Sequence, residues 1–359
     1  MRVLIAPAAR RARIKIAEPL QRVGVEVEMC VASDTPHKGE LLRDAIAGLT
    51  RTAISAADVV LTDMVMTFPA VAAGLGASLR GRPFVLRPRG DWWQEHEDLR
   101  LRGELGLAGS RWAVELFEDC FRSAAAILPV SETLKQMLLE HIVVDPNRMI
   151  PVPIAINTER FRRARDPAVV KRELGYKHEH IVALVTNFTF LKKVAAVERF
   201  LPALRALVEQ REDTAVVIAG DGDVRPNFMA GNRDLLNHPR LILAGYVDRI
   251  ERLYQCSDFV PFFSFLDACP NVPLEAWACA RPVVVNDYPP LTEHLREGET
   301  GYVVANDADP HECLPIFNRL LDDAELRRTM GERGRKLVTQ TFAPEVVGQR
   351  LAEALEGVL

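Results

Sequence analysis

Two carboxylates lie on either side of a predicted helix start within residues 259–301. Asp267 lies in a loop after a buried strand pattern, and Glu275 follows eight residues later. Asn271 between them is a residue type typical of helix N-caps, with Pro273 in the expected first turn. The N–H groups and partial positive charge of a helix start suit a diphosphate. Carboxylates beside it suit ribose and sugar hydroxyl groups, so the residue types predict a sugar-nucleotide site.

The same two carboxylates also allow a purely structural interpretation. Glu275 would then complement the helix dipole, and Asp267 would form a loop turn. Glu275 lies one position too late to close a capping box with Asn271, which weakens that interpretation slightly. The residue types alone leave both interpretations open.

A second polar cluster follows the fourth predicted strand, where Arg89 and Asp91 precede Trp92 and Trp93. We expect the tryptophans to lie in a loop, where they could stack on a sugar face or a lipid-linked acceptor. In the alternative interpretation they pack against the following helix, and Arg89 pairs with Asp91 or Glu95. The first interpretation makes this cluster part of an acceptor site.

An arginine-rich turn follows the first predicted strand, with Arg10, Arg11 and Arg13. These side chains could hold an anionic acceptor such as a lipid pyrophosphate. An ordinary solvated face explains them equally well.

Short apolar or β-branched runs alternate with longer helical patterns, which predicts βαβ units and parallel sheets. The first series of candidate strands is Val3–Ala6, Val25–Cys30, Val59–Thr62, Phe84–Arg87, Ile127–Pro129 and Met149–Val152. The second series is Ile181–Thr186, Ala215–Ala219, Leu241–Ala244, Phe259–Phe263, Pro282–Val285 and Tyr302–Val304. Ligands of such folds bind at the carboxyl ends of the strands.

The length of 359 residues fits two domains. We place the hinge in Pro151–Arg165, between the two strand series. The predicted domains are residues 1–160 on the acceptor side and 161–340 on the donor side. Residues 341–359 form a last helix, which we expect to pack back toward the N-terminal domain.

Composition excludes several classes of protein. With 48% hydrophobic and 26% charged residues the chain is neither disordered nor fibrous. A net charge of −4 without a basic block excludes nucleic acid as an expected partner. The first βα turn lacks GxGxxG, which argues against a nicotinamide-dependent enzyme. Six scattered cysteines without a CxxC pair favour reduced thiols in a cytoplasmic protein, with peripheral contact at the inner membrane face left open.

Asp267 and Glu275, with Arg281-Pro282-Val283-Val284 after them, resemble the ExxxxxxxE signature of GT-B-fold glycosyltransferases. The similarity is greatest to the retaining enzymes of glycosyltransferase family 4 (group 1). Further segments resemble motifs of that family, namely residues 152–161, 218–222, 245–247 and 298–301. The resemblance implies an α/β GT-B fold, in which two Rossmann-like β/α/β domains face each other across a cleft.

The resemblance also implies roles for individual residues. Glu275 would bind the donor ribose, Asp267 the sugar or a nearby phosphate, and Lys192 the diphosphate. Gly245 and Tyr246 would lie near the base. The backbone expected to cradle the diphosphate consists of Ala268, Cys269, Pro270, Asn271 and Val272.

The chain departs from the family pattern at several positions. Thr186 and Asn187 occupy the place of a Gly-Arg pair of the donor site, so one cation is missing. Asp267 replaces a glutamate, Ala280 replaces a glycine, and Arg89 lies where a histidine is common. The implied catalytic residues are therefore Lys192, Asp267, Glu275, Arg89 and Asp91, with Arg10, Arg11, Trp92 and Trp93 on the acceptor side.

The implied activity is that of a hexosyltransferase-type enzyme. It would move a sugar from a nucleotide-diphosphate sugar to a glycan, a lipid-linked acceptor or a small molecule, with retention of configuration. No metal or other cofactor is expected, because the helix start and a lysine would stabilise the leaving diphosphate. The alternatives are a sugar-nucleotide epimerase of the same fold and a catalytically silent nucleotide-sugar-binding protein.

Overall fold

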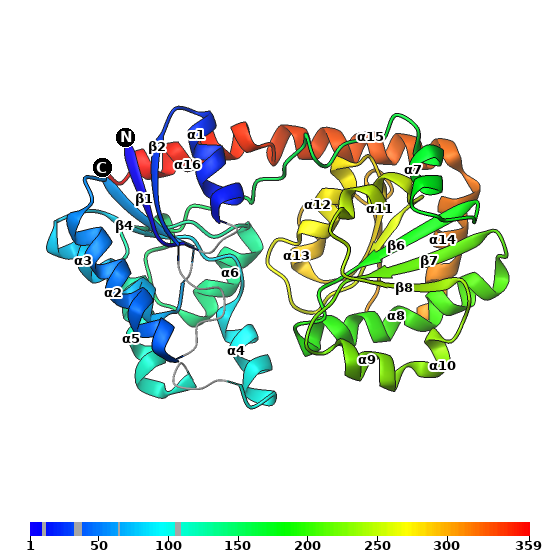
Figure 1. The fold of residues 1–359 in the computed structure, drawn as a ribbon, viewed down its shortest axis with the longest axis horizontal. Helices are drawn as coiled ribbons and strands as arrows, with labels where there is room; N and C mark the ends of the chain where they lie inside the picture. The colour runs from blue at the N-terminus through cyan, green and yellow to red at the C-terminus, as the bar shows by residue number, and fades with distance from the viewer. Residues whose placement is uncertain (9–11, 32–37, 64, 105–108) are drawn as a thin grey trace. The chain divides into compact units, whose positions relative to one another are not determined.

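The computed structural model describes all residues except 9–11, 32–37, 64 and 105–108. The chain forms two compact units (Figure 1). The first comprises Met1–Ala155 and Thr341–Leu359, and the second comprises Ile156–Gln340. Among the described residues, no helix combines the length and the apolar character that crossing a membrane requires.

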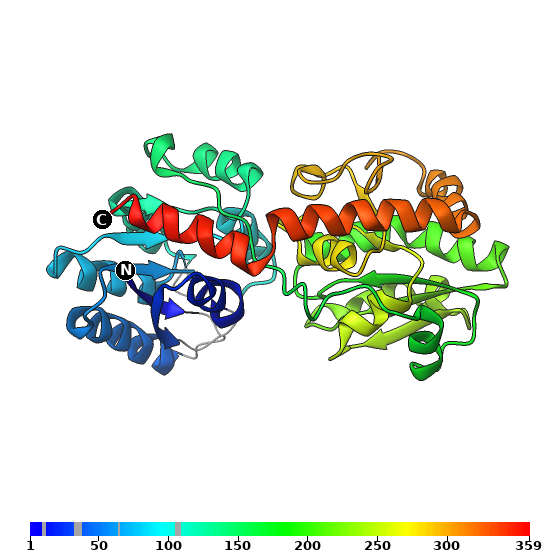
Figure 2. The ribbon, with the colours of Figure 1, turned by 90° about the horizontal axis from the view of Figure 1, so that it is seen from above.

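The first unit is a parallel five-stranded sheet with the strand order β2-β1-β3-β4-β5. Its strands are β1 (Arg2–Ala8), β2 (Glu26–Val31), β3 (Val59–Thr62), β4 (Phe84–Leu86) and β5 (Ala126–Ile127). Its helices are α1 (Glu18–Arg22), α2 (Lys38–Ile54), α3 (Phe68–Leu79), α4 (Trp92–Leu101), α5 (Arg111–Ser123), α6 (Glu132–His141) and α16 (Pro344–Glu356). Helices α2, α3 and α5 lie on one face of the sheet, and α1 and α16 lie on the other (Figures 1 and 2).

Helix α16 completes the core of the first unit although it comes from the end of the chain. Val347, Leu351 and Leu355 are buried in the same apolar cluster as strands β1 and β3. Gly348 faces Pro19 of α1 so closely that a Cβ would overlap the Pro19 carbonyl group. The close packing of two helices here therefore requires a residue without a side chain.

The second unit is built on two three-stranded parallel sheets, β6-β7-β8 and β11-β10-β9. Its strands are β6 (His180–Val185), β7 (Thr214–Ala219), β8 (Leu241–Gly245), β9 (Val260–Phe262), β10 (Val283–Asn286) and β11 (Gly301–Val304). Its helices are α7 (Pro167–Glu173), α8 (Leu191–Gln210), α9 (Arg225–Gly231), α10 (Arg233–Leu236), α11 (Ile250–Cys256), α12 (Asn271–Ala278), α13 (Pro289–Thr292), α14 (Cys313–Asp322) and α15 (Ala324–Thr341). Strand β7 is buried at every position, as expected for a parallel sheet covered on both faces.

Eleven of the predicted strands are present, and none of their ends is shifted by more than two residues. The twelfth, Met149–Val152, is wrong. Only Met149 forms a bridge, to Ile127, and the segment is not a strand. Pro151 lies within it and Pro153 follows, and a residue without an N–H group cannot continue a ladder.

The segment that leaves the first unit is held by two cationic side chains. Arg87 is buried at the end of β4 and donates to the carbonyl oxygens of Val152 (3.0 Å) and Pro153 (2.8 Å). Lys15 donates to the Ala155 carbonyl at 2.8 Å. The beginning of the predicted hinge is thus fixed to the first unit by charged hydrogen bonds.

Candidate functional site

The strand order of the second unit defines where its ligand site should lie. A bridge between Val182 of β6 and Phe259, just before β9, joins the two three-stranded sheets. The order across the joined sheet is therefore β8-β7-β6-β9-β10-β11. The chain order reverses between β6 and β9, so the loops after these strands leave a crevice at their carboxyl ends.

An ion pair occupies this crevice. Lys193, in the first turn of α8, places its Nζ 3.0 Å from Oδ1 of Asp267 in the loop after β9. Both side chains are mostly buried, with exposed fractions of 14% and 13%. The other carboxylate oxygen, Oδ2, is buried and accepts no hydrogen bond from the described residues. A buried acceptor of this kind is suited to a ligand hydroxyl group.

The structure thus assigns the contact with Asp267 to Lys193, which the sequence interpretation passed over. Lys192 is the preceding residue of α8 and is half-buried. Its predicted contact with a diphosphate stays a prediction.

The loop that carries Asp267 is shaped by a buried asparagine at the end of β10. Asn286 accepts a hydrogen bond from the Ser264 amide (2.8 Å) and donates to the Ser264 carbonyl (3.0 Å). This two-point contact fixes the backbone as it leaves β9. Sequence reasoning missed Asn286, although a polar residue at the end of the apolar run Val283–Val285 is a signal for such a role.

Helix α12 begins one residue earlier than expected. Pro270 is the N-cap, in an extended conformation, and Asn271 is the first helical residue. The prediction of Asn271 as the N-cap is therefore wrong. Proline suits the cap position because its fixed φ and missing N–H group cost nothing there. Since Pro270 has no polar side chain, no side-chain hydrogen bond caps this helix start.

The remaining residues of the predicted cradle surround this helix start. Ala268 and Cys269 are buried, and Val272 is half-buried in the first turn. They follow Asp267 directly along the chain, and their predicted contact with a diphosphate stays a prediction.

Glu275 lies in the second turn of α12 and is half-buried. The hydroxyl group of Tyr254, on α11, lies 3.4 Å from Oε2 of Glu275 and donates to it. Tyr254 is completely buried, and this burial, together with the charge of Glu275, holds the pKa of its hydroxyl group well above the usual value. Tyr254 therefore stays a proton donor that orients Glu275, a partner that the sequence interpretation did not find.

Two glycines fix the loop after β6 against the loop after β7. A Cβ on Gly220 would overlap the Thr186 carbonyl, and one on Gly222 would overlap the Phe188 backbone. The Val224 amide donates to the Phe188 carbonyl at 2.9 Å. The path from β6 to the lysines of α8 is thus set by close backbone contact.

The other predicted donor-site residues are arranged around this loop. Thr186 is buried and Asn187 is exposed. The Gly245 carbonyl accepts a hydrogen bond from the Gly220 amide at 2.7 Å, and Tyr246 is 74% exposed. An exposed aromatic ring at the end of β8 is compatible with the predicted place for a base.

In the first unit, the strand order reverses between β1 and β3. Arg10 and Arg11, after β1, lie outside the described residues. Asp63 directly follows β3 with a completely buried side chain, and its Oδ2 lies 3.3 Å from Nη2 of Arg89, after β4. Arg89 therefore pairs with Asp63, and not with Asp91 or Glu95 as the alternative interpretation held.

Asp91 and the two tryptophans have structural roles. Asp91 caps α4, because its Oδ1 accepts from the Trp93 amide at 3.0 Å and its Oδ2 from the Gln94 side chain at 3.0 Å. The expectation that Trp92 and Trp93 lie in a loop is wrong, since they begin α4. Trp93 stacks on His141, with the ring centroids 4.6 Å apart. This packing follows the alternative interpretation, while the predicted catalytic role of Asp91 stays a prediction.

Comparison with known proteins agrees with this geometry. Residues 175–337 match the family "Glycosyl transferases group 1". The second unit of this chain is therefore similar to the group 1 glycosyltransferases. The chain is 29% identical over 208 residues to N-acetyl-alpha-D-glucosaminyl L-malate synthase of Bacillus anthracis, a match that covers 58% of this chain but only 53% of that protein. It is 25% identical over 381 residues to D-inositol 3-phosphate glycosyltransferase of Salinispora arenicola, over 90% and 81% of the two chains.

Solved structures confirm the predicted fold class. Anabaena Alr3699/HepE, crystallised with UDP, has a TM-score of 0.77 at 14% identity and covers 99% of this chain and 100% of its own. Sucrose-phosphate synthase of Thermosynechococcus elongatus has a TM-score of 0.75 at 15% identity, over 99% and 98%. Both units are Rossmann-like, as in the GT-B fold.

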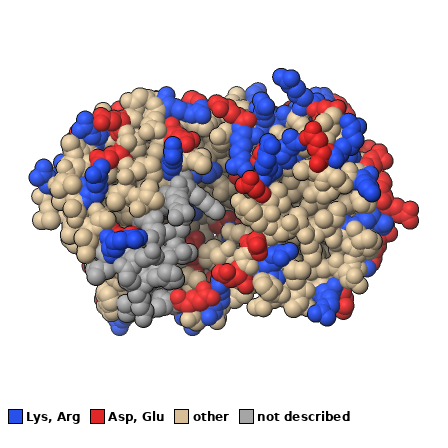
Figure 3. Space-filling view, viewed as in Figure 1, with Lys and Arg blue, Asp and Glu red and all other residues tan. Residues whose placement is uncertain are grey.

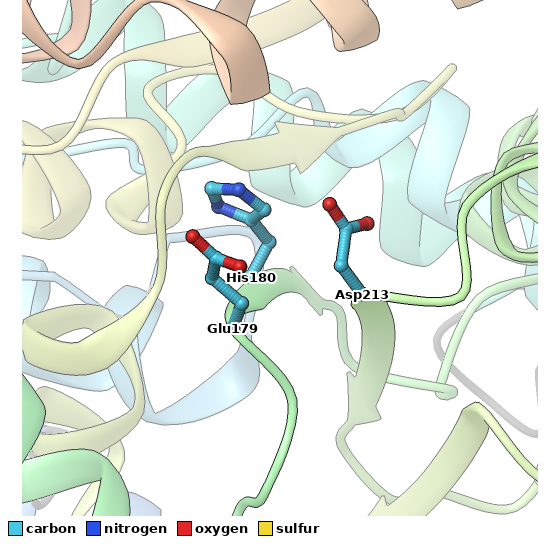
Figure 4. A group of neighbouring side chains, drawn as sticks. All are labelled: Glu179, His180 and Asp213. Atoms are coloured by element: carbon cyan, nitrogen blue, oxygen red, sulfur yellow. The ribbon is translucent and has the colours of Figure 1, made fainter.

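A second group of polar side chains lies at the opposite edge of the sheet in the second unit (Figure 4). Glu179, His180 and Asp213 bring one nitrogen or oxygen atom each within 4.8 Å of one another. Asp213 is held by Arg211 at 2.8 Å, which lowers the pKa of its carboxyl group well below the usual range. His180 lies 3.3 Å from Asp258. These contacts identify an ion-pair network at the start of β6 and β7.

The two histidines of this segment, His178 and His180, are not exposed loop residues. His180 begins β6 with a mostly buried side chain, and His178 is half-buried in the loop before it. The predicted independence from metal stays a prediction.

Proposed function

We propose that this protein moves a hexosyl group from a nucleotide-diphosphate sugar to an acceptor hydroxyl group, with retention of configuration and without a metal ion. The observation that carries the proposal is the Lys193–Asp267 pair in the crevice between β6 and β9. It offers a buried carboxylate oxygen that accepts no hydrogen bond from the described residues, next to a cation and the start of α12. Such a set can hold sugar hydroxyl groups and a diphosphate at the same time.

The reaction is a substitution at the anomeric carbon of the donor. The bond from this carbon to the diphosphate oxygen breaks, and the bond to the acceptor oxygen forms on the same face. The acceptor proton passes to the departing phosphate oxygen, so no separate side-chain base is needed. Lys192 and the amides of α12 stabilise the negative charge that grows on the diphosphate. Asp267 and Glu275 hold the sugar and ribose hydroxyl groups through an oxocarbenium-like transition state.

The relatives suggest which substrates to test first. Anabaena Alr3699/HepE has also been crystallised with UDP-glucose, which makes a UDP-sugar the first donor. The named relatives act on L-malate or D-inositol 3-phosphate, and both of these acceptors carry hydroxyl and anionic groups. Arg89 supplies a cation in the first unit, so we propose a small anionic acceptor of this class. The protein would act in the cytoplasm, with peripheral membrane contact if the acceptor is lipid-linked.

Calorimetric titration tests the donor site. UDP-, GDP-, ADP- and CDP-sugars are titrated into wild-type protein, Glu275→Ala and the surface control Glu299→Ala. We expect one nucleotide class to bind, with at least about tenfold weaker binding in Glu275→Ala, because a charged hydrogen bond is lost. Equal affinity in all three proteins would show that the pocket lies elsewhere.

Product analysis with that donor then tests the reaction. We expect an acceptor-dependent glycoside with unchanged anomeric configuration, detected by NMR. An epimerised donor without acceptor would identify an epimerase, and binding without any product over the acceptor set would identify a silent binding protein. A glycoside with inverted configuration would contradict retention alone.

A further inference from the structure

Arg281 follows the turn that ends α12. It lies at the edge of the sheet opposite the crevice between β6 and β9, which we call the donor crevice. The Ala280 amide donates to Trp277 (2.8 Å), and the Arg281 amide donates to Ala276 (2.9 Å). This is the Schellman pattern, and Ala280 takes the left-handed conformation (φ +58°) that it requires. The turn places Arg281 just before β10, at the amino ends of the strands.

Helix α15 packs directly on this turn. A Cβ on Gly331 would overlap the Ala280 carbonyl, so only glycine permits the observed approach. Arg327 and Arg328 lie one turn earlier on α15 and line the same pocket as Arg281. Charged side chains are intermixed along the edge of the second unit where α7 and α15 lie (Figure 3).

We call this cavity the Arg281 pocket. Its volume is about 260 Å³, which is small for a drug-sized molecule and suits a ligand of a few heavy atoms. Its charged lining consists of four arginines and two carboxylates, namely Arg163, Arg281, Arg327, Arg328, Asp258 and Glu332. The lining therefore carries an excess of positive charge.

Three of the four arginines form ion pairs with these two carboxylates. Glu332 pairs with Arg163 (3.0 Å) and with Arg328 (2.8 Å). Asp258 pairs with Arg327 at 3.2 Å. Arg328 has a further partner outside the lining, and Arg327 also donates to two carbonyl groups at the end of α14.

Arg281 is different from these three. Its Nη2 donates to the Gln255 carbonyl at 2.5 Å, whereas its Nε is buried and donates to none of the described residues. Among the residues that the structure describes, no carboxylate forms an ion pair with it. Burial lowers the pKa of Arg281, against the opposing effect of the Asp258 charge. A guanidinium group withdrawn from water without a counter-ion is unfavourable, and an anion in the pocket would compensate it.

We propose that the Arg281 pocket binds a small soluble ligand through a phosphate group, at a site separate from the donor crevice. The planar guanidinium group matches phosphate oxygens, and arginine is the side chain most suited to them. The two sites lie at opposite edges of one sheet, since Asp258 and Arg281 precede β9 and β10 while Asp267 follows β9. Occupancy of one does not require the other.

Titration of pyrophosphate at fixed ionic strength tests the proposal in the full-length protein. We expect two sites in the wild type, one in Lys192→Gln, which keeps the Arg281 pocket, and one in Arg281→Gln, which keeps the donor crevice. Affinity at the lost site should fall about tenfold or more. Unchanged stoichiometry and affinity in Arg281→Gln would overturn the proposal, whatever happens in the donor crevice.

Further variants, a crystal soak and a vesicle experiment complete this test. Arg163→Gln, at the exposed rim, should weaken the same site if Arg281→Gln fails to fold, and Arg296→Gln is the matched surface control that should change nothing. An anomalous tungstate peak in soaked crystals should lie beside Arg281, and its absence there would overturn the assignment. Sedimentation with phosphatidylglycerol vesicles should be equal for wild type and Arg281→Gln, because loss of vesicle binding in the variant would point to a lipid headgroup and contradict a soluble ligand.

Discussion

Each unit has an ion pair at or near the point where its strand order reverses. The two pairs differ in which member, the carboxylate or the cation, is available to a ligand. In the second unit, Lys193 and Asp267 are buried to a similar degree, and one oxygen of Asp267 accepts no hydrogen bond from any residue that the structure describes. In the first unit, the Asp63 side chain is completely buried while Arg89 is 31% exposed. The second unit thus offers a hydrogen-bond acceptor to a ligand, and the first unit offers donors.

This difference fits binding of the sugar donor by the second unit and binding of the acceptor by the first. An acceptor oxygen beside a cation suits a sugar joined to a diphosphate, whereas an exposed guanidinium group suits an anion or a hydroxyl oxygen. Asp63 acts through Arg89 as a positioning residue, because it holds the guanidinium group and has no exposed surface of its own. The comparison therefore predicts separable effects on donor and acceptor kinetics.

The largest effect is expected for Asp267→Asn. The variant loses the charge that holds Lys193 and the acceptor for a sugar hydroxyl group, so kcat/KM should fall about 100-fold or more. Kinetics with saturating acceptor measure it, and Glu299→Gln is the exposed carboxylate control. Thermal unfolding of the variant should be followed in parallel, since Lys193 is left without its partner. Turnover within twofold of wild type in a folded variant would remove Asp267 from the site.

The first unit should respond on the acceptor side. Arg89→Gln is expected to raise the acceptor KM about 10- to 100-fold and to leave donor affinity unchanged, because hydrogen bonds from a charged group are lost. Asp63→Asn should have a smaller effect on the same parameter, and Arg89→Lys should restore little because it lacks the planar fork. Equal losses of donor and acceptor affinity would show that the two units do not divide the substrates in this way.

A smaller effect is expected for Tyr254→Phe, which removes the hydroxyl group that orients Glu275. Nucleotide affinity should fall about two- to tenfold, as for the loss of one hydrogen bond. Calorimetric titration with the donor measures it. Tyr302→Phe on β11 makes the same chemical change away from the donor crevice and should leave affinity unchanged. A loss in both variants would point to a general effect of tyrosine hydroxyl groups on stability.

Sequence motifs predicted the fold and the two carboxylates because these signals are local. The partners Lys193, Asn286 and Tyr254 come from other segments, and only the sheet brings them together. Lys192 and Lys193 are neighbours on one helix, so they point about 100° apart, and the start of α8 decides which one faces Asp267. No feature of the two lysines themselves distinguishes them.

The wrong placement of Trp92 and Trp93 in a loop could have been avoided from the local sequence. Asp91 and Gln94 have the spacing of a capping box, which predicts a helix that begins at Trp92. The tryptophans would then have been placed on α4, where they pack within the first unit. By contrast, the alanine itself gave no sign that position 280 is left-handed, since alanine rarely adopts this conformation, and the only hint was the glycine that the family pattern has there.

That alanine gives the smallest expected effect, and one confined to the second unit. Ala280 takes the conformation that glycine usually occupies after a helix, which costs about 1–2 kcal/mol. Ala280→Gly removes this strain but makes the unfolded chain more flexible by about 0.4–1 kcal/mol. The net gain should be up to about 1 kcal/mol, or roughly 2–4 °C in the Tm of a unit of this size.

Differential scanning calorimetry measures this gain, with Ala278→Gly as the matched control. Ala278 is helical, so the same substitution there should lower the Tm through the poor helix propensity of glycine. Kinetic parameters for the acceptor should be unchanged in Ala280→Gly, because the turn supports only the helix that carries Glu275. A lower Tm in Ala280→Gly would mean that contacts of the alanine methyl group outweigh the strain, and that α12 is held more by packing than by its terminal turn.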